Sequence, residues 1–273
     1  MASSATSSER ARFAAKLTQA DAIAEHYADF VGEEYDNVII SEYKYVAHTR
    51  VPEQILARTA STRGAARRSL RILDLGCGTG LVARPFFEAE EPHVVVGVDV
   101  TPDMTACAAQ LPYERVVTAT AQEALVGELA GETFDVVLVV GMMEFIEHPP
   151  SFLESCCAAL KGYARNDNRT SSSSSSSDNS PSYLALAVPH KQPFATELRF
   201  GILTHEWEPI VAALQEKCGL TMEWMEDFNG YTVDDGNGDG PVQVMYRGSL
   251  WATKAATTTT ATTTTTQAMT QAD

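Results

Sequence analysis

Apolar and polar residues alternate along this chain in blocks that suit a layered fold of strands and helices. Short apolar runs with little polar interruption are typical of strands buried on both faces, and helical spacing of apolar residues separates one run from the next. Such alternation favours parallel strands joined by crossover helices. The runs lie at residues 72–75, 94–98, 115–119, 134–140 and 183–188.

The pattern of alternating strands and helices changes in the last quarter of the chain. Pro209 opens a helical pattern that Gly219 ends, and two strand-like runs follow at residues 220–228 and 242–253. Only a polar loop separates these two runs, so they are expected to pair as a hairpin. The complete prediction is a doubly wound α/β sheet of seven mostly parallel strands, one of them antiparallel, with helices on both faces.

Composition shifts suggest one domain with tails. Residues 1–10 and the Thr-rich residues 255–273 are expected to be disordered, because neither segment has enough apolar residues to form a core. The same reasoning predicts a disordered Ser-rich insert at 164–182. The domain itself is expected to span 11–254, with an N-terminal helical lid at 11–60.

The most specific motif follows the first apolar run. The sequence ILDLGCGTG at residues 72–80 places an acid at Asp74 and then three glycines at alternate positions. Glycines permit a tight turn where a ligand can lie against bare backbone, so we expect a nucleotide-like ligand here. The second apolar run ends in Asp99, whose two oxygens suit both hydroxyls of a ribose. The glycine spacing does not fit the GxGxxG pattern of dinucleotide-binding proteins, which disfavours a nicotinamide cofactor.

Together, the glycine turn and the segment VVVGVDVTPDM resemble class I S-adenosylmethionine-dependent methyltransferases. The similarity extends over about residues 35–254. Within this class, the chain more specifically resembles the Williams-Beuren-region methyltransferase-like subgroup. The segments YDNVIISEYKYVAHTRVPEQI, LPYERVVTATAQEAL and TFDVVLVVGMMEF carry this finer resemblance.

The resemblance implies S-adenosyl-L-methionine as the cofactor and assigns its contacts. The methionine part would be held by Asp74 and the backbone of Gly76, Cys77 and Gly78, and the ribose by Asp99. The remaining cofactor contacts would be Val100 and Met104 beside the adenine, Thr120 and Ala121 at its edge, and Gly141 at the end of the fourth strand. Acceptor-pocket candidates are Met142, Met143, Glu144 and Phe145, with core packing as their other interpretation. Tyr35 and Tyr43 would reach the cofactor or anchor the lid.

Two histidines are candidates for a general base. His148 and His190 follow the fourth and fifth strands, on the side where wound sheets bind ligands. Each also lies beside a proline, so a solvent-facing or hydrogen-bonded histidine is the alternative. A methyl transfer needs few catalytic side chains, because positioning alone supplies effective molarities of about 10⁵ to 10⁸ M.

The charge and the cysteine content of the chain disfavour several classes of partner and cofactor. The 36 acidic and 20 basic residues give a formal net charge of -16, which disfavours binding to nucleic acid. The apolar runs are too short to cross a membrane, and the five cysteines show no metal-binding spacing. We expect a cytoplasmic protein without a metal site, and the basic residues near the N-terminus leave organelle targeting open.

The function predicted from the sequence is methyl transfer from S-adenosylmethionine to a small molecule, with a protein side chain as the second choice of acceptor. Two alternatives belong to other classes. One is a non-catalytic scaffold that retains the cofactor fold, and the other is an NAD-dependent oxidoreductase.

Overall fold

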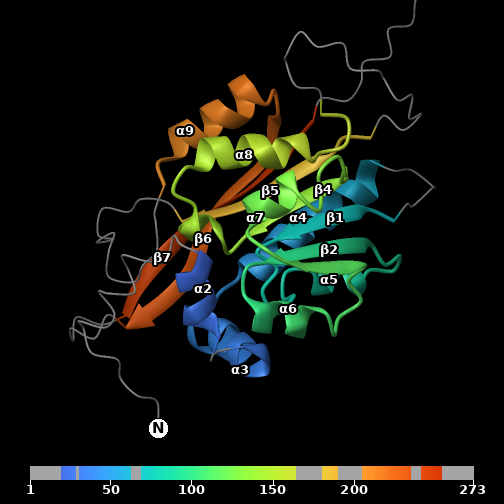
Figure 1. Cartoon of the computed structure of the whole chain (residues 1–273). Helices are drawn as coiled ribbons and strands as arrows, with labels where there is room; N and C mark the ends of the chain where they lie inside the picture. Colours follow the sequence, from blue (N-terminus) through green and yellow to red (C-terminus); the bar gives the residue numbers. More distant parts are fainter. Residues whose placement is uncertain are drawn as a thin grey trace, which may run out of the picture.

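A seven-stranded sheet forms the centre of the chain in a computed structural model, which describes residues 20–28, 31–62, 69–163, 180–189, 205–234 and 241–253 (Figure 1). The strand order is β3-β2-β1-β4-β5-β7-β6, and β7 runs antiparallel to both of its neighbours. The predicted seven-stranded, mostly parallel sheet is therefore confirmed. The strands are β1 (Arg71–Leu75), β2 (Val94–Asp99), β3 (Arg115–Thr118), β4 (Val136–Val140), β5 (Tyr183–Pro189), β6 (Thr221–Asp234) and β7 (Pro241–Ala252).

Alternate side chains of each strand enter two different cores, one on each face of the sheet. Leu73 and Leu75 belong to the core beneath α7 (Ala121–Val126), α8 (Pro149–Ala158) and α9 (Trp207–Ala212). Ile72 belongs to the core on the opposite face, beneath α4 (Ala47–Thr62) and α5 (Arg84–Phe87). Burial on both faces explains why these strands read as continuous apolar runs.

The strand order reverses beside β1, and this reversal determines where a ligand can bind. The chain moves from β1 through β2 to β3 on one side and returns to β4 on the other, with all four strands parallel. Crossover connections then leave in opposite directions at the carboxyl ends of β1 and β4. Open α/β sheets bind ligands in the crevice at such a switch point.

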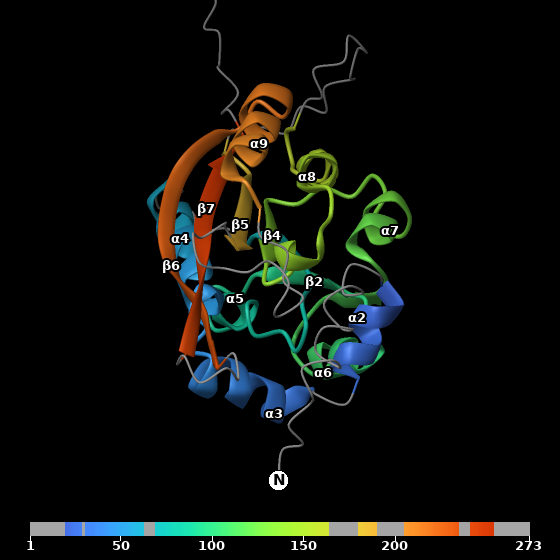
Figure 2. The same cartoon turned by 90° about the vertical axis from the view of Figure 1, so that its left-hand side faces the viewer.

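The N-terminal segment combines two different structural roles. Helices α2 (Ala20–Tyr27) and α3 (Gly32–Asn37) cross the carboxyl-end edge of the strands near α6 (Pro102–Ala108) (Figure 2). A π-helical turn, η1 (Val38–Glu42), leads from there to α4. Although α4 falls within the range predicted as a lid, it packs against β4, β5 and β7 as part of the layer that covers the sheet.

Several predicted boundaries differ from the structure. The sequence pattern predicts a helix over residues 81–89 after the glycine turn, but only α5 within this range is helical. Ser151 and Glu154 have the pattern of a capping box at a helix start, but α8 begins at Pro149, so Ser151 lies inside the helix and donates its hydroxyl to the carbonyl of His148. The end of the predicted insert is ordered: Ser182 is buried, and its backbone N–H donates to the Thr253 hydroxyl.

Other predictions fall on residues that the structure does not describe. These are the tails at 1–10 and 255–273, residues 11–19 of the N-terminal lid, and the greater part of the Ser-rich insert. Within the described ranges, none of the helices combines the length and the apolar character that crossing a bilayer requires.

Candidate functional site

An open cleft with an empty volume of about 810 Å³, part of which is open to solvent, lies at the carboxyl ends of β1, β2 and β4, between these strands and the N-terminal helices. Four segments supply its wall: the glycine turn, the ends of β2 and β3, the end of β4, and helix α2 with Tyr35. The lining residues are Ala20, Ile23, Tyr27, Tyr35, Gly76, Gly78, Val98, Asp99, Val100, Thr101, Met104, Ala119, Thr120, Ala121, Gln122, Gly141, Met142, Phe145 and Ile146.

The glycine turn brings bare backbone to the cleft. Gly76 and Gly78 have φ angles of +73° and +52°, which side-chain-bearing residues rarely adopt. A Cβ atom at Gly76 would lie 2.8 Å from the Met142 Cβ atom, whereas one at Gly78 would meet nothing within 4 Å. The N–H groups of Gly76 and Cys77 both donate to the Val98 carbonyl and thereby fix the turn against β2.

Asp99 closes the turn from the end of β2. One carboxylate oxygen accepts the N–H of Gly78 and the other accepts the N–H of Thr101, both at 2.9 Å. Burial raises the pKa of Asp99, while the hydrogen bonds from Thr101 and Gly78 lower it. Each carboxylate oxygen can accept a further hydrogen bond, so the side chain can organise the turn and still bind a ligand.

Asp74 is not among the residues that line the cleft, and its contact with the methionine part of a cofactor stays a prediction. Its position in β1 places the side chain on the same face as Ile72, where Oδ2 accepts the hydroxyl of Tyr113 at 2.8 Å. The residue is fully buried, and this burial raises its pKa to about 7, with a further contribution from the charge of Asp99. Its observed contact supports the base of the turn.

The predicted adenine contacts all border the cleft, but Thr120 has a different use from the expected one. Val100, Met104 and Ala121 line the cleft through their side chains or backbone. The Thr120 hydroxyl instead joins Glu123 in a capping box that begins α7, accepting the Glu123 N–H and donating to its carboxylate. A hydrogen bond between the Thr120 hydroxyl and an adenine would therefore compete with the hydrogen bonds that cap α7.

After β4, some residues line the cleft and others are buried inside the protein. Gly141, with a φ of +77°, Met142 and Phe145 line the cleft, and a Cβ atom at Gly141 would lie 3.0 Å from the Tyr45 hydroxyl. Met143 is fully buried in the core. Glu144 is 2% exposed and accepts the hydroxyl of Tyr246 at 2.7 Å.

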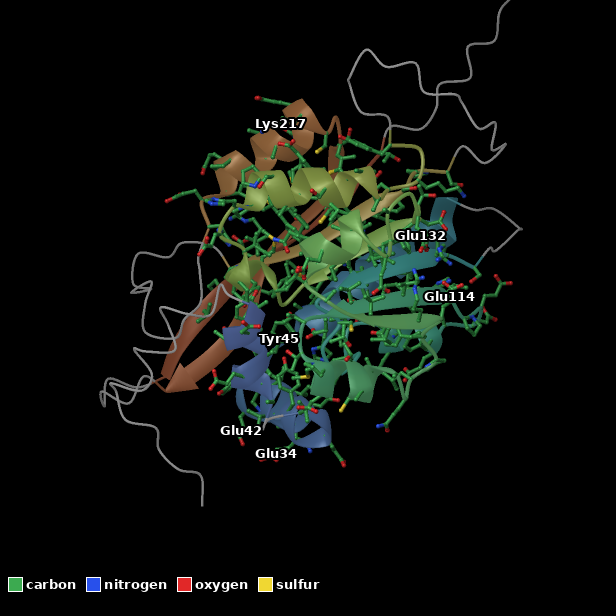
Figure 3. All side chains as sticks on the ribbon, in the orientation of Figure 1. Glu34, Glu42, Tyr45, Glu114, Glu132 and Lys217 are labelled. Atoms are coloured by element: carbon green, nitrogen blue, oxygen red, sulfur yellow. The ribbon has the colours of Figure 1, made fainter. Side chains whose placement is uncertain are left out.

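Aromatic residues of the N-terminal segment cover the cleft opposite β4. The ring of Tyr27 meets those of Tyr35 and Phe145 edge to face, at centroid separations of 6.0 and 6.3 Å. In Figure 3, Tyr45 lies in the interior of the molecule, whereas Glu34 and Glu42 of the same segment point to its outer rim. The sequence predicts that Tyr35 reaches the cofactor or anchors the lid, and that Ile23 and Tyr27 belong to the apolar helical stripe of this lid.

A smaller cavity adjoins the glycine turn on its other side. Tyr35, Tyr45, Cys77 and Thr79 are among its lining residues, and it shares Gly76, Gly78 and Gly141 with the main cleft. Beside it, the carboxylate of Asp36 accepts the hydroxyl of Thr79 and a guanidinium N–H of Arg84. These bonds attach α3 to the glycine turn.

One of the two candidate bases, His148, is exposed at the start of α8 and is not among the residues that line the cleft. The other, His190, is outside the described residues. His205 interacts through Nε2 with the Met143 carbonyl at 2.7 Å, and burial lowers its pKa. In the portion of the chain that is described, no group of three or more histidine, cysteine or acidic side chains could hold a metal ion.

Comparisons with known proteins identify the class of fold. Residues 73–163 match a family model described as a methyltransferase domain. Magnesium protoporphyrin IX methyltransferase from Synechocystis PCC 6803, solved with bound SAM, is similar with a TM-score of 0.55 at 13% identity, covering 86% of this chain and 97% of that one. The plantazolicin methyltransferase BamL, solved with SAH, gives 0.54 at 12% identity, covering 90% and 98%. The chain therefore has the Rossmann-like fold of class I methyltransferases.

Two sequence relatives are both described as ubiquinone biosynthesis O-methyltransferase. The protein from Methylobacterium nodulans is 31% identical over 167 residues, covering 56% of this chain and 61% of the relative. The protein from Haemophilus ducreyi is 33% identical over 98 residues, covering 33% and 41%. The chain thus spans less than two thirds of the length of either relative.

Proposed function

We propose that this chain is an S-adenosyl-L-methionine-dependent methyltransferase that acts on a small molecule. The observation that carries the proposal is the convergence of the glycine turn, Asp99 and Gly141 on one cleft at the switch point of the sheet. The matched methyltransferase model, residues 73–163, begins within β1 and covers all of β2, β3 and β4.

The residues present fit a nucleotide with an amino-acid tail. Asp99 takes the ribose hydroxyls through the remaining lone pairs of its carboxylate, and the side chains of Val100 and Met104 border the adenine. The absence of a side chain at Gly76 and Gly141 leaves room where a Cβ atom would crowd Met142 or Tyr45. The amino-acid tail extends toward the smaller cavity beside the glycine turn, and contact of the tail with Asp74 remains part of the proposal.

The sulfonium of bound S-adenosylmethionine supplies the methyl group together with its leaving group. The contribution of this chain is to hold the acceptor in line with the methyl carbon and to exclude water, which can account for a large part of the rate. Met142, Phe145 and Tyr27 enclose the cleft with apolar and aromatic surface that suits this task. The proposal assigns no general base.

A small-molecule acceptor is favoured by the relatives and by charge. The relatives are named for ubiquinone biosynthesis, and one similar fold is named for protoporphyrin. The net charge of -16 disfavours nucleic acid as the acceptor. A protein side chain remains the second choice, and the resemblance to the Williams-Beuren-region subgroup is a finer proposal that these ubiquinone-type relatives do not support. We also retain residues 11–254 as the proposed domain.

Calorimetric titration tests the cofactor. We expect one molecule of S-adenosylhomocysteine to bind per chain and NADH not to bind, since the glycine spacing lacks the dinucleotide pattern. The reverse preference would support an NAD-dependent oxidoreductase. Incubation with methyl-labelled S-adenosylmethionine and a fractionated cell extract then separates an enzyme from a scaffold, because a scaffold would bind the nucleotide and label nothing.

A further inference from the structure

Helix α3 carries three acidic side chains, which differ in burial. Glu33 and Glu34 are exposed, and Figure 3 shows Glu34 pointing to the outer rim of the molecule, whereas Asp36 is only 7% exposed. Burying a carboxylate is costly unless hydrogen bonds and an opposite charge compensate it. The partners of Asp36 therefore show what this carboxylate does in the structure.

Asp36 joins α3 to two parts of the segment that follows β1. Its Oδ1 atom accepts the hydroxyl of Thr79 in the glycine turn, and its Oδ2 atom accepts a guanidinium N–H of Arg84 at the start of α5, both at 2.5 Å. Hydrogen bonds to a carboxylate are shorter and stronger than those between neutral groups. Thr79 is 4% exposed, so water has little access to the first of these bonds. One carboxylate thus attaches α3 both to the turn and to the helix beyond it.

This attachment fixes the aromatic wall of the cleft, which Tyr27, Tyr35 and Phe145 form. Tyr35, the residue before Asp36, lines both the main cleft and the smaller cavity. The Tyr35 ring lies 6.0 Å from that of Tyr27 in α2, and the Tyr27 ring lies 6.3 Å from that of Phe145, measured between centroids. Figure 2 shows α2 and α3 together at the same edge of the molecule. Movement of α3 away from the glycine turn would therefore displace Tyr35 and break its contact with Tyr27.

We propose that Asp36 holds α2 and α3 closed over the cleft before a nucleotide binds, so that Tyr27 and Tyr35 are already in place to contact it. This inference rests on the proposed function and adds to it the residue that preorganises the aromatic wall. Asp36 is a positioning residue, since it is not among the residues that line the cleft or the smaller cavity. Preorganisation increases affinity because a ligand binds only the fraction of molecules that is ready to receive it.

Calorimetry with S-adenosylhomocysteine and hydrogen exchange of the nucleotide-free chain together test this role. Asp36→Ala removes both bonds. We expect only about a fifth of the variant molecules to hold the aromatic wall in place, so S-adenosylhomocysteine should bind about fivefold more weakly than to the wild type. Without nucleotide, the backbone N–H groups of α2 and α3 should exchange at least about tenfold faster than in the wild type, and those of β4 should be affected less.

Two variants of the partner keep the test decisive if Asp36→Ala does not fold. Arg84→Met removes one bond at a side chain that is 41% exposed, and we expect binding to weaken about two- to threefold. Arg84→Lys restores a positive charge and should recover most of the wild-type affinity. The matched control is Glu34→Gln, which removes an exposed carboxylate from the same helix and should change neither affinity nor exchange.

Wild-type affinity in Asp36→Ala, or in Arg84→Met where Asp36→Ala does not fold, would overturn the inference while leaving the proposed function intact. Equal acceleration of exchange in β4 and in the two helices would also overturn it, because Asp36 would then support the whole fold rather than the aromatic wall. Failure of the wild-type chain to bind S-adenosylhomocysteine would contradict the proposed function and this inference together.

Discussion

The two walls of the cleft are built in different ways. The wall formed by the glycine turn and Asp99 comes from residues 74–104, a continuous stretch in which backbone hydrogen bonds fix the geometry. The opposite wall joins Tyr27 and Tyr35 from the N-terminus to Phe145 after β4, with Tyr246 of β7 behind Glu144. The first wall is local and readable as a motif, whereas the second exists only after distant segments pack together.

The largest expected change in nucleotide affinity comes from a substitution in the wall formed by the glycine turn. Gly76→Val would force a branched side chain into a backbone conformation with φ of +73°, and its Cβ atom would meet Met142 at 2.8 Å. We expect the affinity for S-adenosylhomocysteine to fall at least about a hundredfold, because the turn itself must move. Calorimetry would measure the loss. Gly131→Val, at a glycine with a φ of +81° remote from the cleft lining, controls for general backbone strain and should retain binding where it folds.

Asp74→Asn tests whether Asp74 supports the turn or contacts the ligand. Burial raises the Asp74 pKa from 3.8 to about 7, so the folded chain holds a proton that the unfolded chain has released. The contribution of Asp74 to stability is therefore present below the unfolded pKa and is lost as pH rises through about 7. Between pH 4 and pH 8, the free energy of unfolding of Asp74→Asn should rise by at most about 2 to 4 kcal/mol relative to that of the wild type.

Urea unfolding at several pH values would measure this gain, and nucleotide affinity at pH 6 should change little. Stability curves of the wild type and Asp74→Asn that stay parallel over this range would show that Asp74 does not titrate as described. A large loss of affinity would instead return Asp74 to its predicted role in binding.

Asp99→Ala addresses the carboxylate that serves both the turn and the ligand. We expect nucleotide binding to weaken by about 1 to 3 kcal/mol, because a charged hydrogen-bond acceptor is removed from the ribose. Asp99→Asn is the matched variant, since it preserves the size of the side chain. Comparison of adenosine with 2′,3′-dideoxyadenosine in both variants isolates the ribose contact, and an unchanged affinity in Asp99→Ala would exclude it.

The smallest expected change in nucleotide affinity comes from a substitution of Thr120 at the edge of the cleft. Thr120→Ala should lower the free energy of unfolding by about 1 kcal/mol, because the capping box of α7 is lost. Nucleotide affinity should remain within about twofold, since the hydroxyl is engaged by Glu123. Thr120→Ser, which can rebuild the cap, should recover most of the stability. A selective loss of affinity without a loss of stability would restore the predicted adenine contact.

The contrast between the walls also explains what the sequence could and could not predict. Gly76, Gly78 and Asp99 were found because strand, turn and acid follow one another at fixed spacing. The face on which Asp74 lies depends on its register in β1, and the partner that holds it, Tyr113, comes from the loop before β3. Glu144 was a candidate for the acceptor pocket, but its bond to Tyr246 joins residues 102 positions apart, which no local pattern reveals.

A crystal structure of the chain with S-adenosylhomocysteine tests the central claim most directly. The account predicts that the ribose hydroxyls lie within hydrogen-bonding distance of Asp99, with the sulfur between Gly76 and Gly141 and the amino-acid tail toward Thr79. A nucleotide bound elsewhere, or one whose ribose faces away from Asp99, would contradict it.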